Sequence, residues 1–471
     1  MNTDTAEPAA VDTASGLAVP RARRAFLHIT SGRAVAWLGR LSADPVRMRA
    51  ARDSLRALWV SRVLVLAGGV GAVAVLGFGS SRGAFNPPGL TRGFGWLGDL
   101  LAAPVARWDS DWYLAIAGHG YHPDVSRTAY FPLYPLLMRA VGSLGPPLIV
   151  AGVLVSLCAF ALALYGIHRL TTLELARVRG RISVVHSDAA GVARLAVIVT
   201  AFSPMAFFFS AVYTDALYLA LSVGVFWSAR HGRWLWVGVL GALAGATRST
   251  GLMLAVPALI IYLYGPREDR PPDLGVRGLC PRYRPRWDLL WLALLPVGVG
   301  AYCGWLALSG GDALGPFHAE QAWSRHFVGP YLGVWDGVKA AFEGARQLLS
   351  FQNHHVYFKL AGGNPSVVAY HNLMELAFLL LAIPAVVGVL RRLPLAYGAY
   401  VLAAMALPLS YPVAPQPLMS VPRYLVVLFP LGIWLAAWLW ERPRLQRPAF
   451  ALSVLLMLFF TAEFSTWHWV A

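Results

Sequence analysis

The stretch PPLIVAGVLVSLCAFALALYGIHR, residues 146–169, decides the fold class of this chain. Its apolar part is long enough to cross a bilayer, which requires about 20 apolar residues in one helix. Similar stretches lie near 58–78, 192–211, 214–229, 288–309, 368–390, 394–410, 421–440 and 449–469. The chain is 57% hydrophobic and only 13% charged, whereas soluble domains carry about 25% charged residues. These features predict an all-α integral membrane protein that crosses the bilayer many times.

The apolar stretch 234–263 is long for a single helix, and Arg248 interrupts it. If this stretch is a hairpin of two short helices, the basic loop 264–287 lies on the same side as the other basic loops. The inner side then carries 28 of the 39 Lys and Arg residues and the outer side 9. The positive-inside rule therefore favours the hairpin, a cytoplasmic N-terminus and about 11 transmembrane segments.

Three regions are expected along the chain. Residues 1–20 are small and polar and are expected to be disordered. Residues 21–56 are rich in arginine, which is typical of an amphipathic helix on an anionic leaflet or of a solvated helix. Residues 57–471 form the polytopic region, with outer loops at 79–145 and 310–367. The net charge of +16 does not indicate nucleic-acid binding, because the arginines flank apolar segments.

Two carboxylates, Asp109 and Asp111, lie in the run Arg-Trp-Asp-Ser-Asp-Trp-Tyr at 107–113, in the first outer loop. Ionisable residues beside lipid are costly and are often functional. The alternative is an interfacial belt in which the aromatic rings lie at headgroup level and the acids face water. Asp215, Arg248 and Arg423 are expected on the same side of the membrane, and this convergence favours a functional site.

Several short motifs follow Trp108-Asp109 in order. They are YLAIA at 113–117, Gly120-Tyr121, AYFPLYPL at 129–136, SPMAFFFSAVYTD at 203–215 and ATRSTG at 246–251. Together they resemble the phosphatidylinositol-glycan class V mannosyltransferases and their bacterial relatives over roughly 105–255. A further short stretch at 422–430 also resembles this family. Two positions depart from the family pattern, which usually has Glu at the position of Asp215 and Phe at that of Tyr130.

This resemblance implies a polytopic glycosyltransferase of the GT-C type. Such enzymes transfer a sugar from a polyprenyl-phosphate donor to an acceptor on the extracytoplasmic face, with inversion, and an acid of the first outer loop acts as base. The implied sugar is mannose, the implied location is the cell membrane, and the partners are the lipid-linked donor, membrane lipids and an unknown lipid, glycan or protein acceptor.

The acceptor hydroxyl requires a base, and Asp109 is the first candidate because it directly follows Trp108. Asp111 is the alternative. On an extended segment the two carboxylates point the same way and could share a divalent cation, whereas on a helix they diverge. No other metal site is expected.

Arg248 and Arg423 are candidates for binding the donor phosphate, because a guanidinium binds phosphate bidentately. A buried ion pair with Asp215 is the structural alternative for Arg248, and an arginine snorkelling to the interface is the alternative for Arg423. Further candidates for substrate binding, each with a purely structural alternative, are Trp108, Tyr121, Tyr134, Asp215, Glu320 and Gln321.

A transporter or flippase of lipid-linked sugars is the rival class. Transporters tend to have inverted repeats and charges at the bilayer midplane. No clear repeat relates the two halves of this chain, and its polar groups collect at one surface. Arg248, within its broken helix, is the feature that keeps the rival open.

Overall fold

The computed structural model describes residues 44–79, 95–121, 125–177, 188–273, 280–322, 324–352, 354–357 and 364–470. Within these ranges the chain is helical, apart from an isolated β-bridge between Arg325 and Val413. The described chain divides into two units after Ala51, and residues 52–471 hold nearly all of the described helices. The segment expected to be disordered, 1–20, and most of the basic segment 21–56 lie outside the described residues.

Four described helices are long and apolar enough to span a membrane. They are α2 (Pro45–Leu76), α7 (Leu148–Arg177), α15 (Pro365–Arg392) and α19 (Pro443–Ser465). A fifth span is formed if η4 (Trp287–Leu294) and α12 (Val297–Leu308), which meet at 45°, count as one broken helix. The expectation of a polytopic helical membrane protein is therefore confirmed, but the count of about 11 spans is not.

Other apolar stretches form shorter helices because their sequences contain breaks. These are α8 (Ala189–Ala201), α9 (Asp215–Arg230), α16 (Leu395–Leu409), α17 (Val421–Val426) and α18 (Phe429–Trp440). Ser203-Pro204 follows α8, and Pro430 begins α18 after an interruption. At a rise of about 1.5 Å per residue, helices of this length fall short of the roughly 30 Å hydrocarbon layer.

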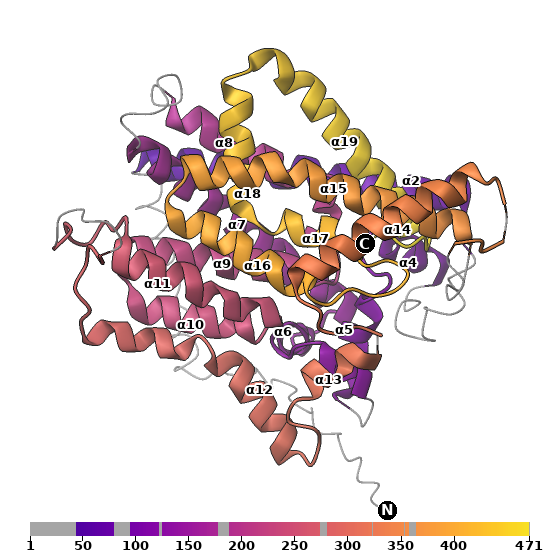
Figure 1. Cartoon of the computed structure of the whole chain (residues 1–471), viewed down its shortest axis with the longest axis horizontal. Coiled ribbons are helices and arrows are strands. Elements are labelled where there is room, and N and C mark those ends of the chain that lie inside the picture. Colours follow the sequence, from indigo (N-terminus) through magenta and orange to yellow (C-terminus); the bar gives the residue numbers. More distant parts are fainter. Residues whose placement is uncertain are drawn as a thin grey trace, which may run out of the picture. The chain divides into compact units, whose positions relative to one another are not determined.

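The stretch 234–263 reverses direction at Arg248, as a hairpin requires. It forms α10 (Trp234–Gly245), the 3-10 turn η3 (Ser249–Leu254) and α11 (Ala255–Tyr264), and α10 and α11 lie side by side in Figure 1. Trp234 at the start of α10 contacts Tyr262 near the end of α11, with ring centroids 4.6 Å apart. A side chain at Gly251 would collide with the backbone of Ala244, so glycine permits this tight reversal.

Both expected outer loops contain helices. The first holds α4 (Gly95–Ala102), α5 (Ser110–His119), η1 (Val125–Ala129) and α6 (Leu133–Gly142), and the second holds α13 (Gly315–Ala322) and α14 (Pro330–Leu349). Small residues of α14 allow close packing on its neighbours, because a side chain at Gly333 would meet the Leu409 carbonyl and one at Gly344 the backbone of Ala369.

Helix α7 packs on both α8 and α9, and α18 packs on α8, to form the main apolar core. The 3-10 turn η2 (Ala206–Phe209) places three buried phenylalanines in this core. At the C-terminal ends of α7 and α9, Arg230 Nε donates to Glu174, and the Tyr397 hydroxyl of α16 donates to the same carboxylate. This buried cluster connects α7, α9 and α16 near the C-terminal end of α9. The opposite, N-terminal end of α9 begins at Asp215.

Candidate functional site

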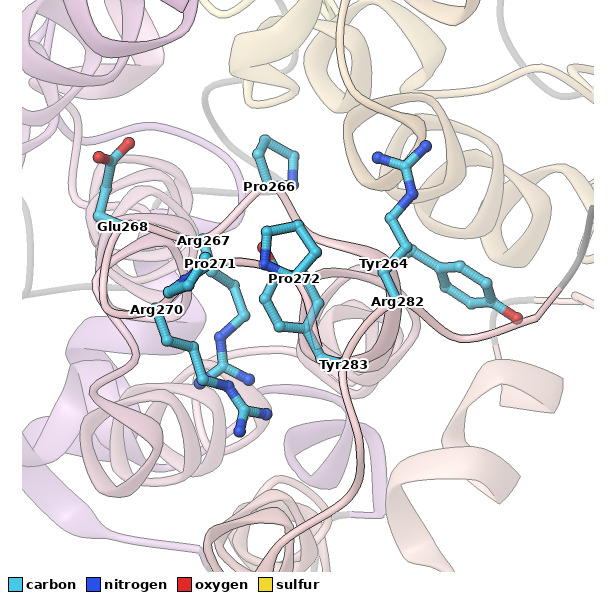
Figure 2. A pocket seen from close by; sticks show the side chains of 9 residues that line it. All are labelled: Tyr264, Pro266, Arg267, Glu268, Arg270, Pro271, Pro272, Arg282 and Tyr283. Atoms are coloured by element: carbon cyan, nitrogen blue, oxygen red, sulfur yellow. The ribbon is translucent and has the colours of Figure 1, made fainter. Parts of the chain in front are cut away.

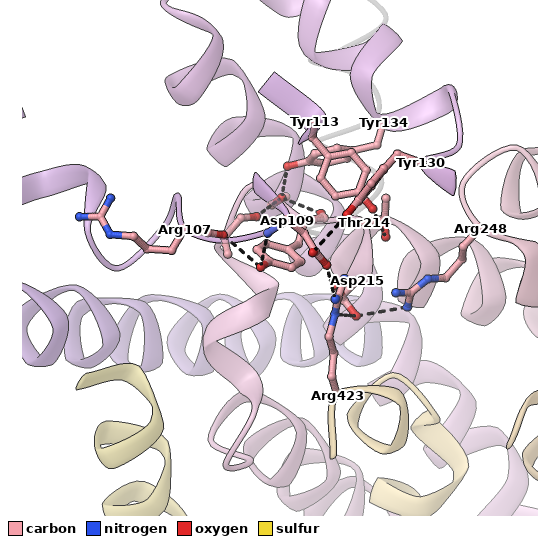
Figure 3. A network of polar contacts seen from close by, with 12 residues as sticks. Arg107, Asp109, Tyr113, Tyr130, Tyr134, Thr214, Asp215, Arg248 and Arg423 are labelled. Carbon is pink, nitrogen blue, oxygen red and sulfur yellow. Dashed lines mark hydrogen bonds and ion pairs between the residues drawn. The ribbon is translucent and has the colours of Figure 1, made fainter. Parts of the chain in front are cut away.

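Four charged residues from distant parts of the chain form one continuous network (Figure 3). Arg423 Nη1 donates to Asp109 Oδ2 at 2.8 Å. The Nε of the same guanidinium donates to Asp215 Oδ2 at 3.1 Å, and its Nη2 lies 3.0 Å from that oxygen. Arg248 Nη1 donates to Asp215 Oδ1 at 3.2 Å. The signs of the charges therefore alternate from Asp109 to Arg423, Asp215 and Arg248.

Each member of the network is held at an interruption or an end of a helix. Asp109 occupies the N-cap position of α5 without a side-chain capping bond, Asp215 is the first residue of α9, and Arg423 lies in the short helix α17. Arg248 has an extended backbone at the reversal between α10 and η3. Side chains at such positions project beyond the helix packing, which allows four elements to converge.

Burial differs along the network. The Asp215 side chain is fully buried, whereas those of Arg248 and Asp109 are 14% and 24% exposed. A buried carboxylate is tolerated only when paired, and Asp215 has two arginine partners. The accessible ends of the network are therefore Asp109 and Arg248, on either side of the buried Arg423–Asp215 pair.

The two arginines differ in the hydrogen bonds that they make. Arg423 uses Nε and both Nη atoms for Asp109 and Asp215, whereas Arg248 makes one described side-chain hydrogen bond, through Nη1. Its guanidinium carbon lies 5.6 Å from the ring centroids of both Tyr218 and Tyr424. Arg248 thus forms the ion pair with Asp215 that the sequence offered as its structural alternative. Its side chain is also partly exposed and keeps further N–H groups available to an anion.

Tyrosines around the network were only partly anticipated from the sequence. The Tyr213 hydroxyl accepts from the Asp109 backbone N–H at 3.1 Å and donates to the Arg107 carbonyl at 3.0 Å. The Tyr213 ring also lies 4.4 Å from the Arg423 guanidinium carbon. Its position directly before Thr214-Asp215 in the quoted motif is the only sequence signal that could have identified it.

Tyr130 contacts the candidate base directly. Its hydroxyl donates to Asp109 Oδ1 at 3.3 Å, and its ring stacks on Trp112 with centroids 5.6 Å apart. The sequence suggested that Tyr130 lines the sugar or holds the loop, and it marked Tyr130 as a departure from the family's usual phenylalanine. A phenylalanine at this position could not make the hydrogen bond to Asp109.

No described hydrogen bond joins Asp111 to the network. Asp109 and Ser110 have helical geometry, so the Asp109 and Asp111 side chains diverge and lack the extended arrangement that a shared cation would need. Asp111 is 7% exposed, and among the residues that the structure describes neither of its carboxylate oxygens has a hydrogen-bond partner. Burial raises its pKa to about 8; nearby Arg107 lowers this pKa and Asp109 raises it. In the described part of the chain, no group of three or more His, Cys, Asp or Glu side chains is arranged to hold a metal ion.

The aromatic side chains that were expected to bind substrate lie outside the network of four charged residues. Tyr134 is buried and bonds to Gly152 and Ser156 of α7. Tyr121 donates to the Tyr130 carbonyl and packs against Tyr302 of α12. The side chains of Glu320 and Gln321 lie outside the described residues. Trp108 precedes Asp109 and packs against tryptophans that follow α19.

A hollow of about 360 Å³ lies elsewhere, at the far end of α11 from Arg248 (Figure 2). It is lined by residues of the loop after α11, with Arg282 and Tyr283. Arg267 in this wall is bonded to Asp269 and lies over the rings of Trp234 and Tyr283. These contacts fix the loop. None of the four residues of the acid–arginine network lines the hollow.

The helices and the network together define a multi-pass helical membrane protein in which charged residues from four distant segments meet at one site. Residues 84–262 match the family described as Mannosyltransferase (PIG-V), which confirms the resemblance expected from the motifs. This region contains Asp109, Asp215 and Arg248, but Arg423 lies beyond it.

Part of the chain is also similar in sequence to curated mannosyltransferases. The chain is 30% identical over 182 residues to proteins named GPI alpha-1,6-mannosyltransferase 2 from Rattus norvegicus and from Mus musculus. The match covers 36% of this chain and 34% of each relative, so it spans about a third of their length. No solved structure is significantly similar to the chain.

Proposed function

We propose that this protein is a membrane mannosyltransferase of the GT-C type that takes mannose from a polyprenyl-phosphate donor. The observation that carries the proposal is the Asp109–Arg423–Asp215–Arg248 network, three of whose members lie within the segment that matches the mannosyltransferase family. The acceptor is a hydroxyl of a lipid, glycan or protein on the extracytoplasmic side.

Asp109 is the general base in this proposal. Its carboxylate takes the proton of the acceptor hydroxyl while the acceptor oxygen forms a bond to the anomeric carbon of mannose. The bond from that carbon to the phosphate oxygen breaks on the opposite face, so the configuration inverts. The bonds from Arg423 and Tyr130 orient the carboxylate, and its partial exposure leaves room for the acceptor.

Arg248 binds the leaving phosphate in this proposal. The phosphate gains negative charge as the sugar departs, and a guanidinium with available donors stabilises that charge. Asp215 holds Arg248 in place, and the flanking rings of Tyr218 and Tyr424 restrict its movement. Arg423 is already bonded to both carboxylates, so we assign it to positioning Asp109 and not to the phosphate.

The direct test is to incubate purified protein in lipid nanodiscs with radiolabelled polyprenyl-phosphate-mannose and a panel of lipid, glycan and peptide acceptors. Wild-type protein is expected to form a labelled mannoside. A parallel assay in sealed vesicles measures movement of the lipid-linked sugar between leaflets. Transport without product would establish the rival flippase function and overturn the enzyme assignment.

A further inference from the structure

Trp108, which directly precedes Asp109, has a backbone φ of 57°. A residue with a Cβ rarely adopts this left-handed conformation, because the Cβ approaches the following carbonyl oxygen. Such a conformation persists only where the surrounding structure enforces it. The contacts of Trp108 therefore identify what sets the direction of the chain as it enters Asp109.

Three of the described contacts come from residues 466–470, the segment that follows α19. Trp108 Nε1 donates to the His468 carbonyl at 3.2 Å. The Trp108 ring packs edge-on against Trp467 and Trp469, with centroid distances of 5.7 and 5.1 Å. One segment thus holds both the polar and the apolar part of the Trp108 side chain.

The same part of the chain fixes Arg107, on the other side of Trp108. The Arg107 side chain is fully buried, and its guanidinium carbon lies 4.9 Å from the Trp467 ring centroid. Its Nε also donates to the carbonyl of Ser465, the last residue of α19. With residues 107 and 108 both held, little freedom remains in the backbone that leads into Asp109.

The segment 466–470 is itself anchored from two directions. The Gly79 N–H, just after α2, donates to the Thr466 carbonyl at 2.7 Å. His371 Nε2 of α15 lies 2.8 Å from the Trp469 carbonyl oxygen. The Trp467 side chain is 1% exposed, so it lies in the core of this anchor.

We propose that residues 466–470 act as a positioning element for the candidate base, with Trp467 as the central positioning residue; this inference rests on the proposed function. The element holds Trp108 at positive φ, and this conformation aims Asp109 at Arg423 and at the accessible end of the network. Without it, Trp108 relaxes to negative φ and rotates Asp109 away from its partners.

The first test compares Trp467→Ala and Trp467→Phe in steady-state mannosyl transfer. Trp467→Ala is expected to lower kcat at least 10-fold while KM for the donor stays within about twofold, because Arg248 is unaffected. Trp467→Phe keeps an aromatic face toward Trp108 and Arg107 and should retain most of the wild-type kcat. The exposed Trp287 provides a control, and Trp287→Ala should leave both constants unchanged. An unchanged kcat in Trp467→Ala overturns the proposal.

The second test isolates the backbone conformation and needs no change in the anchor. Trp108→Gly and Trp108→Ala both remove the ring, but only glycine adopts positive φ without steric cost. Trp108→Gly is therefore expected to have a kcat about 5-fold or more above that of Trp108→Ala. Equal rates in the two folded variants overturn the proposal, and this comparison decides the matter if Trp467→Ala does not fold.

Amide hydrogen exchange separates this inference from the proposed function. If the wild-type protein forms no mannoside, the proposed function fails, yet the positioning contact still predicts faster exchange across residues 107–113 in Trp467→Phe and Trp467→Ala, graded in that order. Exchange in α9 should not change. Unaltered exchange across 107–113 in Trp467→Ala overturns the positioning role regardless of activity.

Discussion

Arg423 Nη1 lies 2.8 Å from Asp109 Oδ2, although 314 positions separate the two residues in the chain. The same guanidinium bonds to the fully buried Asp215, so one side chain orients the candidate base and neutralises its buried neighbour. We therefore expect the geometry of the site to depend on this planar fork as well as on its charge.

Replacing Arg423 by lysine is expected to lower kcat more than about 100-fold, because an ammonium cannot bond to Asp109 and Asp215 with the same planar geometry. Arg423→Gln leaves a buried carboxylate with less compensation and should also destabilise the protein by about 3–5 kcal/mol. Mannosyl transfer and thermal unfolding in detergent measure the two effects. Near-normal kcat in Arg423→Lys would show that charge alone suffices.

Replacing Arg248 by lysine is expected to raise KM for the polyprenyl-phosphate donor at least about 10-fold and also to lower kcat, because lysine cannot bind the phosphate bidentately, either in the substrate or as its charge develops. The protein should still fold, since lysine keeps a positive charge beside Asp215. Arg442→Lys is the matched control, because Arg442 is exposed and lies at the start of α19. A donor KM that changes equally in both variants would rule out a phosphate site at Arg248.

Asp109→Asn preserves the size of the side chain but removes the group that accepts the proton. General-base catalysis contributes about 10²- to 10⁴-fold, so kcat should fall by that order with little change in donor KM. Asp336→Asn, at a partly exposed acid of α14 paired with Lys339, should not alter the rate. An Asp109→Asn enzyme with substantial turnover would require another base.

Asp111→Asn is expected to stabilise the protein in a pH-dependent way. Burial raises the Asp111 pKa from its ordinary 3.8 to about 8, so the native state holds a proton that the unfolded state releases above pH 4. Wild-type stability should therefore fall as pH rises from about 4 to 8, by at most about 1.4 kcal/mol per pH unit for this group.

Because Asn cannot ionise, the thermal midpoint of Asp111→Asn should exceed that of the wild type by an amount that grows from pH 5 to pH 8. Thermal unfolding at these two pH values measures the difference. A constant difference across this range would show that Asp111 is not held neutral in the folded protein.

The native Cys280, exposed in the loop after α11, allows the orientation to be tested with few changes. In a background with Cys158 and Cys303 replaced by alanine, an impermeant maleimide added to sealed cells should not label Cys280. Ser143→Cys, in the first outer loop, should be labelled under the same conditions when Cys280 is also replaced. Labelling of Cys280 from outside would contradict the cytoplasmic placement of this loop, which follows from the distribution of arginine.

The sequence by itself determined the membrane class, the reversal at Arg248 and the choice of Asp109, Asp215, Arg248 and Arg423 as residues of interest. Each of these depends on a local property: the hydrophobicity of about 20 consecutive residues, an arginine within an apolar run, or a short motif. The number of long spans could not be predicted in this way, because an apolar stretch such as 421–440 reads as continuous although the chain breaks between α17 and α18.

The tertiary structure alone decided how these residues act on one another. It paired Arg423 with Asp109, buried Asp111 without a hydrogen-bond partner among the described residues, placed Tyr134 in the core and brought Trp467 against Trp108. Contacts between residues hundreds of positions apart leave no periodicity or spacing in the sequence. They arise because burial of a charge requires an opposite charge nearby, and only the packing of the helices determines which one is within reach.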